Sequence, residues 1–393
     1  MKNKIREFAK KISPKLIEIR RQLHQYPELS FQEFETSKYI AAELTSWGIE
    51  FETGMAGTGI CAWIKGQNPE NRKITLRADI DALPINEANE VAYKSKNEGV
   101  MHACGHDAHT SSLLGAAYIL NQLREHWSGT IQLIFQPGEE LLPGGATKVI
   151  AEGWLDRPYP STCILGQHVE PGMEVGKIGL CSGLFMASAD EIYVTVTGKG
   201  GHGARPQDCI DTILISSQLT VALQQIVSRR ANPIIPSVLT FGKINSSGGA
   251  TNIIPNEVKI LGTFRTFDEQ WRIEAHELMQ TMAEQLCASM GAHCEFNIIK
   301  GYPFLLNNPN ITEQLRRDAS EYLGAENVIK MAPRMGAEDF AFYSHKMPAS
   351  FYRLGTKNPN GSGLHSNTFD IDEAALEIGA GLMAWLAVKQ LEN

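Results

Sequence analysis

The densest group of potential metal ligands in the sequence is the segment 101–109 (MHACGHDAH), which holds three histidines, a cysteine and an aspartate. Cys104 and His106 are two residues apart, so on an extended backbone both side chains would point to one side and could share an ion. A helix that begins near His109 would place Cys104 at its positive end and favour the thiolate that binds metal. Capping and packing before a helix is the alternative interpretation, and the number of ligand-type residues favours a metal site.

Two adjacent carboxylates, Glu139 and Glu140, form the second candidate group, directly after Pro137 and Gly138. Neighbouring side chains on an extended backbone face opposite ways, so one carboxylate could bind a metal while the other faces a substrate. Nearby cations would offset the repulsion between two buried carboxylates. An exposed acidic turn is the alternative, and the pair alone does not decide between the two.

Four groups of candidate residues share one feature, which is that each group follows or ends a predicted strand. With the strand in parentheses, the candidates are Asp79 and Asp81 (74–76), Glu139 and Glu140 (130–135), His168 (162–165) and His365 (350–354). In α/β sheets, ligands gather at the carboxyl ends of the strands. We therefore expect these scattered residues to converge in space.

The strands that carry these residues alternate with helices. Helical spacing marks residues 109–127 and the first 50 residues, which Pro27 divides into two pieces. Short apolar strands between helices are typical of an α/β fold with a mainly parallel sheet covered by helices. We expect residues 1–185 and 301–393 to form one such domain, which binds the metal and carries out catalysis.

The middle of the chain, residues 186–300, has a different pattern. A half-exposed strand is predicted first, followed by a helix, two strands, a helix and a strand, at 190–197, 209–229, 237–245, 257–266, 270–290 and 292–299. The order βαββαβ is typical of a ferredoxin-like module. Its long apolar strands predict an edge that pairs with another subunit, so we expect an inserted domain that forms a homodimer.

Composition narrows the classes of function. The chain has 393 residues, a formal net charge of −8 and no Lys/Arg-rich cluster, which argues against nucleic acid or an anionic membrane as a partner. Its seven dispersed cysteines predict reduced thiols. No apolar run has the length of a membrane span, and the first residues lack an apolar signal core. We expect a cytoplasmic protein.

Motifs along nearly the whole chain carry a family resemblance. They lie at 23–30 (LHQYPELS), 77–84 (RADIDALP), 101–109, 136–140 (QPGEE), 200–206 (GGHGARP), 336–340 (GAEDF) and 364–366 (LHS). In this order they resemble the metal-dependent aminoacylase and carboxypeptidase family. The resemblance is greatest to the branch of hippurate hydrolases, auxin-conjugate amidohydrolases and N-acetyl-diaminopimelate deacetylases.

The resemblance implies a role for each matching residue. Glu139 would be the general base, and His202 would stabilise the oxyanion, reaching the site from the partner's inserted domain in related dimers. Asn252 and Arg265 match positions that bind the substrate carboxylate. The implied metal ligands are Cys104, His106, Glu140, His168 and His365.

Other polar residues near the motifs are expected to orient the ligands rather than bind metal. These residues are Asp79, Asp107 and His109. The ligand set implies two divalent ions per subunit. A thiolate beside imidazole and carboxylate suits zinc, while manganese, cobalt and nickel remain open.

The resemblance implies hydrolysis of the amide bond in small N-acyl amino acids, with an N-acetyl, benzoyl or similar group. Glu139 would take the proton of a metal-activated water and later protonate the leaving amine. His202 would help to hold the oxyanion. The inserted domain would act as a lid, closing over the substrate through the flexible turn at 198–201 and bringing in His202 and Arg265.

Three alternatives stay open. A metallocarboxypeptidase or dipeptidase also cuts an amide beside a free carboxylate, and the sequence does not separate it from a deacylase. A cysteine hydrolase could use Cys104 with a nearby histidine, but Glu139, His168 and His365 would then have no role. A non-catalytic binding or regulatory protein could keep the fold, but the intact set of ligands argues against it.

Overall fold

The computed structural model of the chain describes residues 1–392, which divide into two compact units. Unit 1 comprises residues 1–185, 306–332 and 339–392, and unit 2 comprises residues 186–305 and 333–338. Among the described residues, no helix is both long and apolar enough to cross a membrane. The body of unit 2 is thus inserted between the first and second stretches of unit 1.

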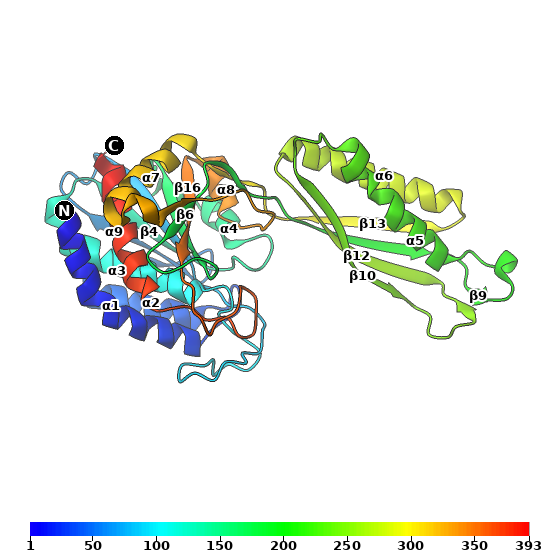
Figure 1. Cartoon of the computed structure of the whole chain (residues 1–393), viewed down its shortest axis with the longest axis horizontal. Helices are drawn as coiled ribbons and strands as arrows, with labels where there is room; N and C mark the ends of the chain where they lie inside the picture. The colour runs from blue at the N-terminus through cyan, green and yellow to red at the C-terminus, as the bar shows by residue number, and fades with distance from the viewer. Residues whose placement is uncertain (393) are drawn as a thin grey trace. The chain divides into compact units, whose positions relative to one another are not determined.

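Unit 1 (Figure 1) is built around a sheet of eight strands, whose order is β1-β2-β4-β3-β5-β16-β6-β15. The strands are β1 (Glu50–Met55), β2 (Gly59–Lys65), β3 (Lys73–Asp79), β4 (Thr130–Gln136), β5 (Ile164–Glu170), β6 (Ile178–Leu180), β15 (Val328–Lys330) and β16 (Ala349–Gly355). The four central strands β4, β3, β5 and β16 run parallel, and antiparallel pairs join β1, β2 and β6 towards the edges. The predicted α/β fold with a mainly parallel sheet is confirmed.

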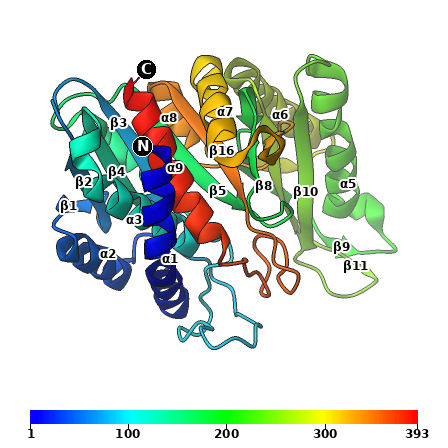
Figure 2. The ribbon, with the colours of Figure 1, turned by 60° about the vertical axis from the view of Figure 1, so that its left-hand side comes forward.

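Helices pack onto this sheet. The helices of unit 1 are α1 (Lys2–Gln25), α2 (Phe34–Ser46), α3 (His106–Gln122), α4 (Gly145–Ala151), α7 (Pro309–Leu323), α8 (Ala341–Lys346) and α9 (Ala375–Glu392). Helices α3 and α9 contact β3, and α1 contacts both helices (Figure 2), whereas α4 and α8 contact β4 and β16. Strands β3, β4 and β16 are buried along their whole length, as expected of strands covered on both faces.

Helix α1 leads into a loop near the site, and its sequence explains which face is buried and where the helix ends. Its apolar residues recur at helical spacing and form a buried stripe, which includes Ile5, Ile12, Leu16, Ile19 and Leu23. Helix α1 ends at Gln25 and α2 begins at Phe34, so the chain divides at Pro27 as predicted. The loop 26–33 connects the two helices.

Two predicted strands continue further in the structure, and the first of them, β3, ends at Asp79 rather than at residue 76. Strand β5 starts at Ile164 and ends at Glu170, whereas the sequence predicted residues 162–165. His168 therefore lies inside the strand rather than at its end. The polar residues after Leu165 do not look like a strand in the sequence, but β16 pairs with β5 along its whole length and keeps the strand going.

Unit 2 contains the predicted βαββαβ order. The elements are β8 (Asp190–Thr197), α5 (Thr212–Leu223), β10 (Ser237–Ser246), β12 (Glu257–Thr266), α6 (Glu269–Ser289) and β13 (His293–Lys300). The strands form one antiparallel sheet in the order β10-β12-β8-β13. Ile192, Val194 and Val196 of β8 share a core with residues of α5 and α6. This arrangement is that of a ferredoxin-like module.

Unit 2 also has a two-stranded ribbon, in which β9 (Gly201–His202) pairs with β11 (Ile253–Ile254). At the other end of the unit, Asp190 at the start of β8 faces Lys300 at the end of β13 on the neighbouring strand. Entry to and exit from the insertion therefore lie side by side. The short strands β7 (Gly183–Met186) and β14 (Leu305–Asn307) occur where the chain passes from one unit to the other.

Candidate metal centre

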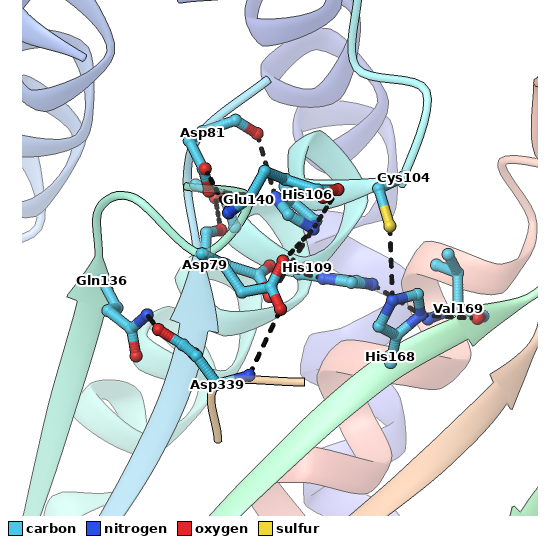
Figure 3. A network of polar contacts seen from close by, with 12 residues as sticks. Asp79, Asp81, Cys104, His106, His109, Gln136, Glu140, His168, Val169 and Asp339 are labelled. Carbon is cyan, nitrogen blue, oxygen red and sulfur yellow. Dashed lines mark hydrogen bonds and ion pairs between the residues drawn. The ribbon is translucent and has the colours of Figure 1, made fainter. Parts of the chain in front are cut away.

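Side chains from within β5, from the ends of β3 and β4 and from the start of α3 meet at one edge of the unit 1 sheet (Figure 3). Three groups of potential ligand atoms each lie within 4.8 Å of one another: Cys104, His106 and His168; Cys104, Glu140 and His365; and His106, Glu139 and Glu140. The groups share members, so they form one continuous cluster. The structure thus brings together all five residues that the resemblance implied as ligands.

Cys104 and His106 reach this cluster through a turn. Gly105 between them has a φ of 82°, and α3 begins at His106. A Cβ at position 105 would come within 2.6 Å of Val169 Cγ2, so the turn has room only for glycine. The expected extended stretch and helix start near His109 are therefore wrong, because the left-handed glycine lets the helix start three residues earlier.

The two buried histidines of the cluster are each held through one ring nitrogen. His106 Nδ1 lies 2.9 Å from the carbonyl oxygen of Asp81, and His168 Nδ1 lies 2.7 Å from the carbonyl oxygen of Val169. A carbonyl only accepts, so Nδ1 carries a proton in both rings and Nε2 faces the cluster. His106 Nε2 is buried without a hydrogen-bond partner, and His168 Nε2 lies 3.5 Å from Cys104 Sγ. Metal-binding histidines are held in this way, so the residues fit a metal.

The protonation of the cluster shows what a cation would displace. Burial raises the pKa of the Cys104 thiol to about 12, and the nearby Glu140 acts in the same direction. Burial lowers the pKa of His106, but Asp79 and Cys104 raise it more, so the net pKa lies above its ordinary value. Without a cation, burial beside carboxylates therefore keeps the Cys104 thiol protonated despite its position before the helix. A divalent cation supplies the missing positive charge and would release the thiol proton.

Glu139 and Glu140 lie in a bend that follows Gly138, whose φ is 64°. Glu139 Oε2 lies 4.0 Å from His106 Nε2, and Glu140 Oε1 lies 3.9 Å from the same atom. The expected extended backbone with opposed side chains is wrong, because the chain turns at Gly138 and both carboxylates reach the cluster. Glu139 Oε1 also accepts a hydrogen bond from the N–H of Asp339, at 3.3 Å.

His365 completes the cluster from a strained backbone position. Its φ is 60°, a conformation that is uncommon for a residue other than glycine. Its N–H donates to the carbonyl oxygen of Ala103 at 2.8 Å, and its Nε2 lies 3.3 Å from Glu140 Oε1. The side chain is 54% exposed, so it forms the open side of the cluster.

His109 and Asp79 already use their polar atoms within the protein. His109 Nδ1 lies 2.6 Å from Asp79 Oδ1, and its Nε2 accepts from the N–H of Val169 at 2.9 Å. Arg77 Nη1 donates to Asp79 Oδ2 at 2.6 Å. Both ring nitrogens of His109 are therefore in use, and Asp79 holds His109 and Arg77 in place.

Asp107 lies away from the ligands that it was expected to orient. Its Oδ2 accepts from Arg20 Nε at 2.8 Å and lies 2.8 Å from His24 Nδ1. Arg20 also donates to Asp370 Oδ1 at 2.8 Å, so these residues form a buried charge network. The expectation for Asp107 is wrong because successive residues on a helix point about 100° apart, which turns it away from His106.

Asp81, which the sequence placed among the candidate ligands, instead holds two other members of the cluster. Its Oδ1 lies 3.2 Å from His106 Nδ1, and its Oδ2 accepts from the N–H of Glu140 at 2.9 Å and from Ser30 Oγ at 2.6 Å. One carboxylate therefore fixes two candidate ligands. The available signal was its position two residues after Asp79 in the motif at 77–84.

The remaining candidates lie in unit 2. His202 and Asn252 are exposed on the β9–β11 ribbon, where the carbonyl oxygen of Asn252 accepts from the N–H of Gly203 at 2.7 Å. The N–H of Ala204 donates to His202 Nδ1 at 3.0 Å, so a neutral His202 carries its proton on Nε2. Arg265 lies near the opposite end of the unit 2 sheet, about 25 Å away by strand length.

Comparisons with known proteins identify the family of this chain. Residues 75–389 match the model of the family described as peptidase family M20/M25/M40. N-acetyl-L-cysteine deacetylase of Bacillus subtilis is 44% identical over 381 residues, which cover 97% of this chain and 89% of the relative. Thermostable carboxypeptidase 2 of Saccharolobus solfataricus is 38% identical over 392 residues, which cover 98% of both chains.

A solved structure gives the same result for the fold. The crystal structure of a dinuclear metal-binding peptidase of the M20 family from Bacillus subtilis matches with a TM-score of 0.83 and 36% identity, over 98% of this chain and 99% of that one. The cluster of ligand-type side chains thus lies in a fold shared with a dinuclear metal-binding enzyme. The chain belongs to peptidase family M20/M25/M40.

Proposed function

We propose that this protein is a metal-dependent amidohydrolase that removes the acyl group from small N-acyl amino acids. The observation that carries the proposal is the convergence of a thiol, three imidazoles and a carboxylate beside a second carboxylate, in a chain of the M20 family. The 44% identity to an N-acetyl-L-cysteine deacetylase supports this class of substrate.

Two divalent cations per subunit would be held by the five clustered donors. The proposed ligands are Cys104, His106, Glu140, His168 and His365. Sulfur beside imidazole and carboxylate favours zinc, with manganese, cobalt or nickel as alternatives. When bound, the cations would polarise the amide carbonyl and lower the pKa of the attacking water.

Glu139 is the proposed general base. The N–H of Asp339 holds its Oε1, while its Oε2 lies on the side of His106 Nε2. Glu139 Oε2 would therefore take a proton from the attacking water and return it to the leaving nitrogen. Its side chain is only 8% exposed, which limits proton exchange with bulk water.

We further propose a homodimer in which His202 serves the cluster of the other subunit. Within unit 2, His202 and Arg265 stand at opposite ends of the sheet, so a single unit 2 that closes over one small substrate could not bring both residues to it. A second copy would supply the missing residue. Helix α5 offers it an apolar surface, with exposed fractions of 44% for Ile213, 55% for Leu214 and 74% for Val221.

In that dimer the unit 2 residues would have two different roles. The Nε2–H of His202 would donate to the oxygen that gains negative charge. Asn252 and Arg265 would bind the substrate carboxylate, Arg265 through its planar fork of donors. Asn252 lies beside His202 on the ribbon and would come from the same subunit as that histidine.

The seven cysteines support a reducing compartment. All are free in the structure, and six of them are buried. We infer that the protein works in the cytoplasm.

The test is metal analysis followed by a panel of N-acetyl, N-benzoyl and dipeptide substrates with the metal-loaded protein. Faster turnover of N-acyl amino acids supports the proposal. Preference for peptides favours the second candidate, a metallocarboxypeptidase or dipeptidase, to which the 38% identity with a carboxypeptidase points. Activity that survives exhaustive chelation contradicts the metal site and favours a Cys104 hydrolase. Full metal loading without any turnover favours a binding or regulatory protein.

A further inference from the structure

The backbone N–H groups on either side of Glu139 are both bound by carboxylates. The N–H of Gly138 donates to Glu33 Oε1 at 2.9 Å, and the N–H of Glu140 donates to Asp81 Oδ2 at 2.9 Å. Glu33 lies in the loop 26–33 and precedes Gly138 by 105 residues. A distant loop therefore holds the backbone of the bend that carries both clustered carboxylates.

The burial of Glu33 at this contact costs free energy. It is fully buried, and its oxygens accept hydrogen bonds from the N–H of Phe31 at 2.8 Å, from the N–H of Gly138 and from Thr58 Oγ1 at 2.5 Å. None of these partners is a cation, and burial raises the pKa of Glu33 to about 7. A buried carboxylate is expensive to keep, so its contact with the bend calls for a reason beyond loop folding.

The loop and the bend also fit closely against each other. A Cβ at Gly138 would lie 2.3 Å from Cζ of the Phe31 ring, so the ring occupies the space that any other residue would need. Phe31 itself has a φ of 63°, and Lys148 Nζ lies 3.8 Å from the centre of its ring. Two left-handed residues in contact show that the surrounding structure imposes this arrangement.

We propose that Glu33 is a positioning residue for the Glu139–Glu140 bend, because its hydrogen bond to the N–H of Gly138 fixes where the two carboxylates point. The inference rests on the proposed function, in which Glu139 is the base and Glu140 a metal ligand. Such groups must be held to within about 0.5 Å of their working geometry, which an unsupported bend would not provide.

The test compares Glu33→Ala, Glu33→Gln and Glu33→Asp with the matched control Glu35→Ala, in the full-length metal-loaded protein. Glu35 is exposed two residues further on, and its side chain pairs with Lys38. Amide hydrogen exchange is measured for peptides that span residues 136–142. Metal content, Tm, kcat and KM are measured on the same samples.

In Glu33→Ala the N–H of Gly138 loses its acceptor. We expect exchange in residues 136–142 to become about 10-fold faster and kcat to fall about 10-fold, with KM within about 2-fold and metal content unchanged. Glu33→Gln should restore both values to within about 3-fold, because its amide oxygen can accept from the N–H and its amide nitrogen can donate to Thr58. Glu35→Ala should behave as the wild type.

Three results would overturn the inference. They are unchanged exchange and kcat in Glu33→Ala, a loss of kcat only in proportion to lost metal or folded protein, and a Glu33→Gln variant as impaired as Glu33→Ala. If Glu33→Ala does not fold, Glu33→Asp keeps the charge but withdraws it by one methylene, and it must show the same two effects to a smaller degree. A fully active Glu139→Gln variant would contradict the proposed function instead, and the exchange data would still decide whether Glu33 holds the bend.

Discussion

The candidate residues of unit 1 and unit 2 differ in how the protein holds them. In unit 1, His106 and Glu140 are both fixed by Asp81, and the backbone of the bend is held from both sides. In unit 2, His202 and Asn252 are exposed on a two-stranded ribbon. The candidate residues of unit 1 are thus held by buried side chains of the same chain, whereas His202 and Asn252 have only local backbone contacts and leave the rest of their side chains exposed.

This difference has an energetic consequence. A buried polar network is strong only when every member is satisfied, so a single substitution in the unit 1 cluster disturbs several groups at once. An exposed residue can usually be replaced with a change in stability of about 0.5 kcal/mol or less. Substitutions of the proposed ligands and of the buried charges that hold them should therefore alter metal binding or stability, and those on the ribbon should alter rate alone.

The largest expected effect is in unit 1. Glu139→Gln should lower kcat about 10³-fold, because an amide cannot take the proton of the attacking water. Metal content should stay at the wild-type level, as measured by elemental analysis. Glu140→Gln is the matched contrast, since it should lose metal together with rate. A Glu139→Gln variant with near-normal kcat would show that the base is another group.

The next effect is in unit 2. His202→Ala should lower kcat about 10²-fold without changing metal content or Tm, because it removes the proposed oxyanion donor from an exposed position. The control is His293→Ala, another exposed histidine of unit 2.

Mixing the His202→Ala and Glu139→Gln proteins tests whether the histidine acts across a dimer. In a mixed dimer, one cluster would have both Glu139 and the partner's histidine, so about a quarter of the wild-type activity should return. No recovery after subunit exchange, or an active monomer by light scattering, rules out a histidine supplied by the other subunit.

A third pair of variants separates the cluster from the neighbouring charge network. Asp81→Ala should weaken metal binding about 10- to 100-fold, because His106 and Glu140 lose their common support. Asp107→Asn should leave metal affinity unchanged but lower the free energy of unfolding by about 3 kcal/mol, because Arg20 loses a buried partner. Titration with the metal and denaturant unfolding distinguish the two outcomes, and equal effects on affinity would contradict the distinction.

The smallest effects concern pH, and the two units should differ in sign. Burial raises the pKa of Glu33 from 4.5 to about 7, so its contribution to stability is present below pH 4.5 and is lost as the pH rises through 7. The free energy of unfolding of the wild-type protein should fall by about 1–3 kcal/mol over that range, and Glu33→Gln should not show this fall. Denaturant unfolding at pH 5 and pH 8 measures the difference.

In unit 2, the dependence of the free energy of unfolding on pH should change at acid pH instead. Burial opposes ionisation of Asp190, but hydrogen bonds from His276 and Arg272 lower its pKa below the ordinary value. Its contribution is therefore present above the unfolded pKa and is lost as the pH falls through the folded one. Asp190→Asn should make unfolding less sensitive to acid below pH 4, and an unchanged dependence on acid would contradict this assignment.

The order of helices and strands could be predicted from the sequence because apolar residues recur with the period of each element. The end of β5 could not, since Gln167 and His168 are polar and belong to the strand only through pairing with β16. The spacing of apolar residues within one segment does not show which distant segment it contacts.

The candidate ligands could also be predicted, because their residue types sit in motifs, but the directions of the side chains could not. Gly105 and Gly138 adopt left-handed conformations that reverse the expectation of extended backbone. The contact of Glu33 with Gly138 and that of Asp107 with Arg20 join segments that have no shared periodicity. Both depend on the packing of the whole unit.

The neighbouring positions of Asp190 and Lys300 have a consequence for how this architecture can change. A chain that departs and returns on adjoining strands leaves a gap that a turn of about 2–5 residues can bridge. The inserted body can therefore be lengthened, trimmed or exchanged as a cassette, while the sheet that carries the cluster keeps its own connectivity.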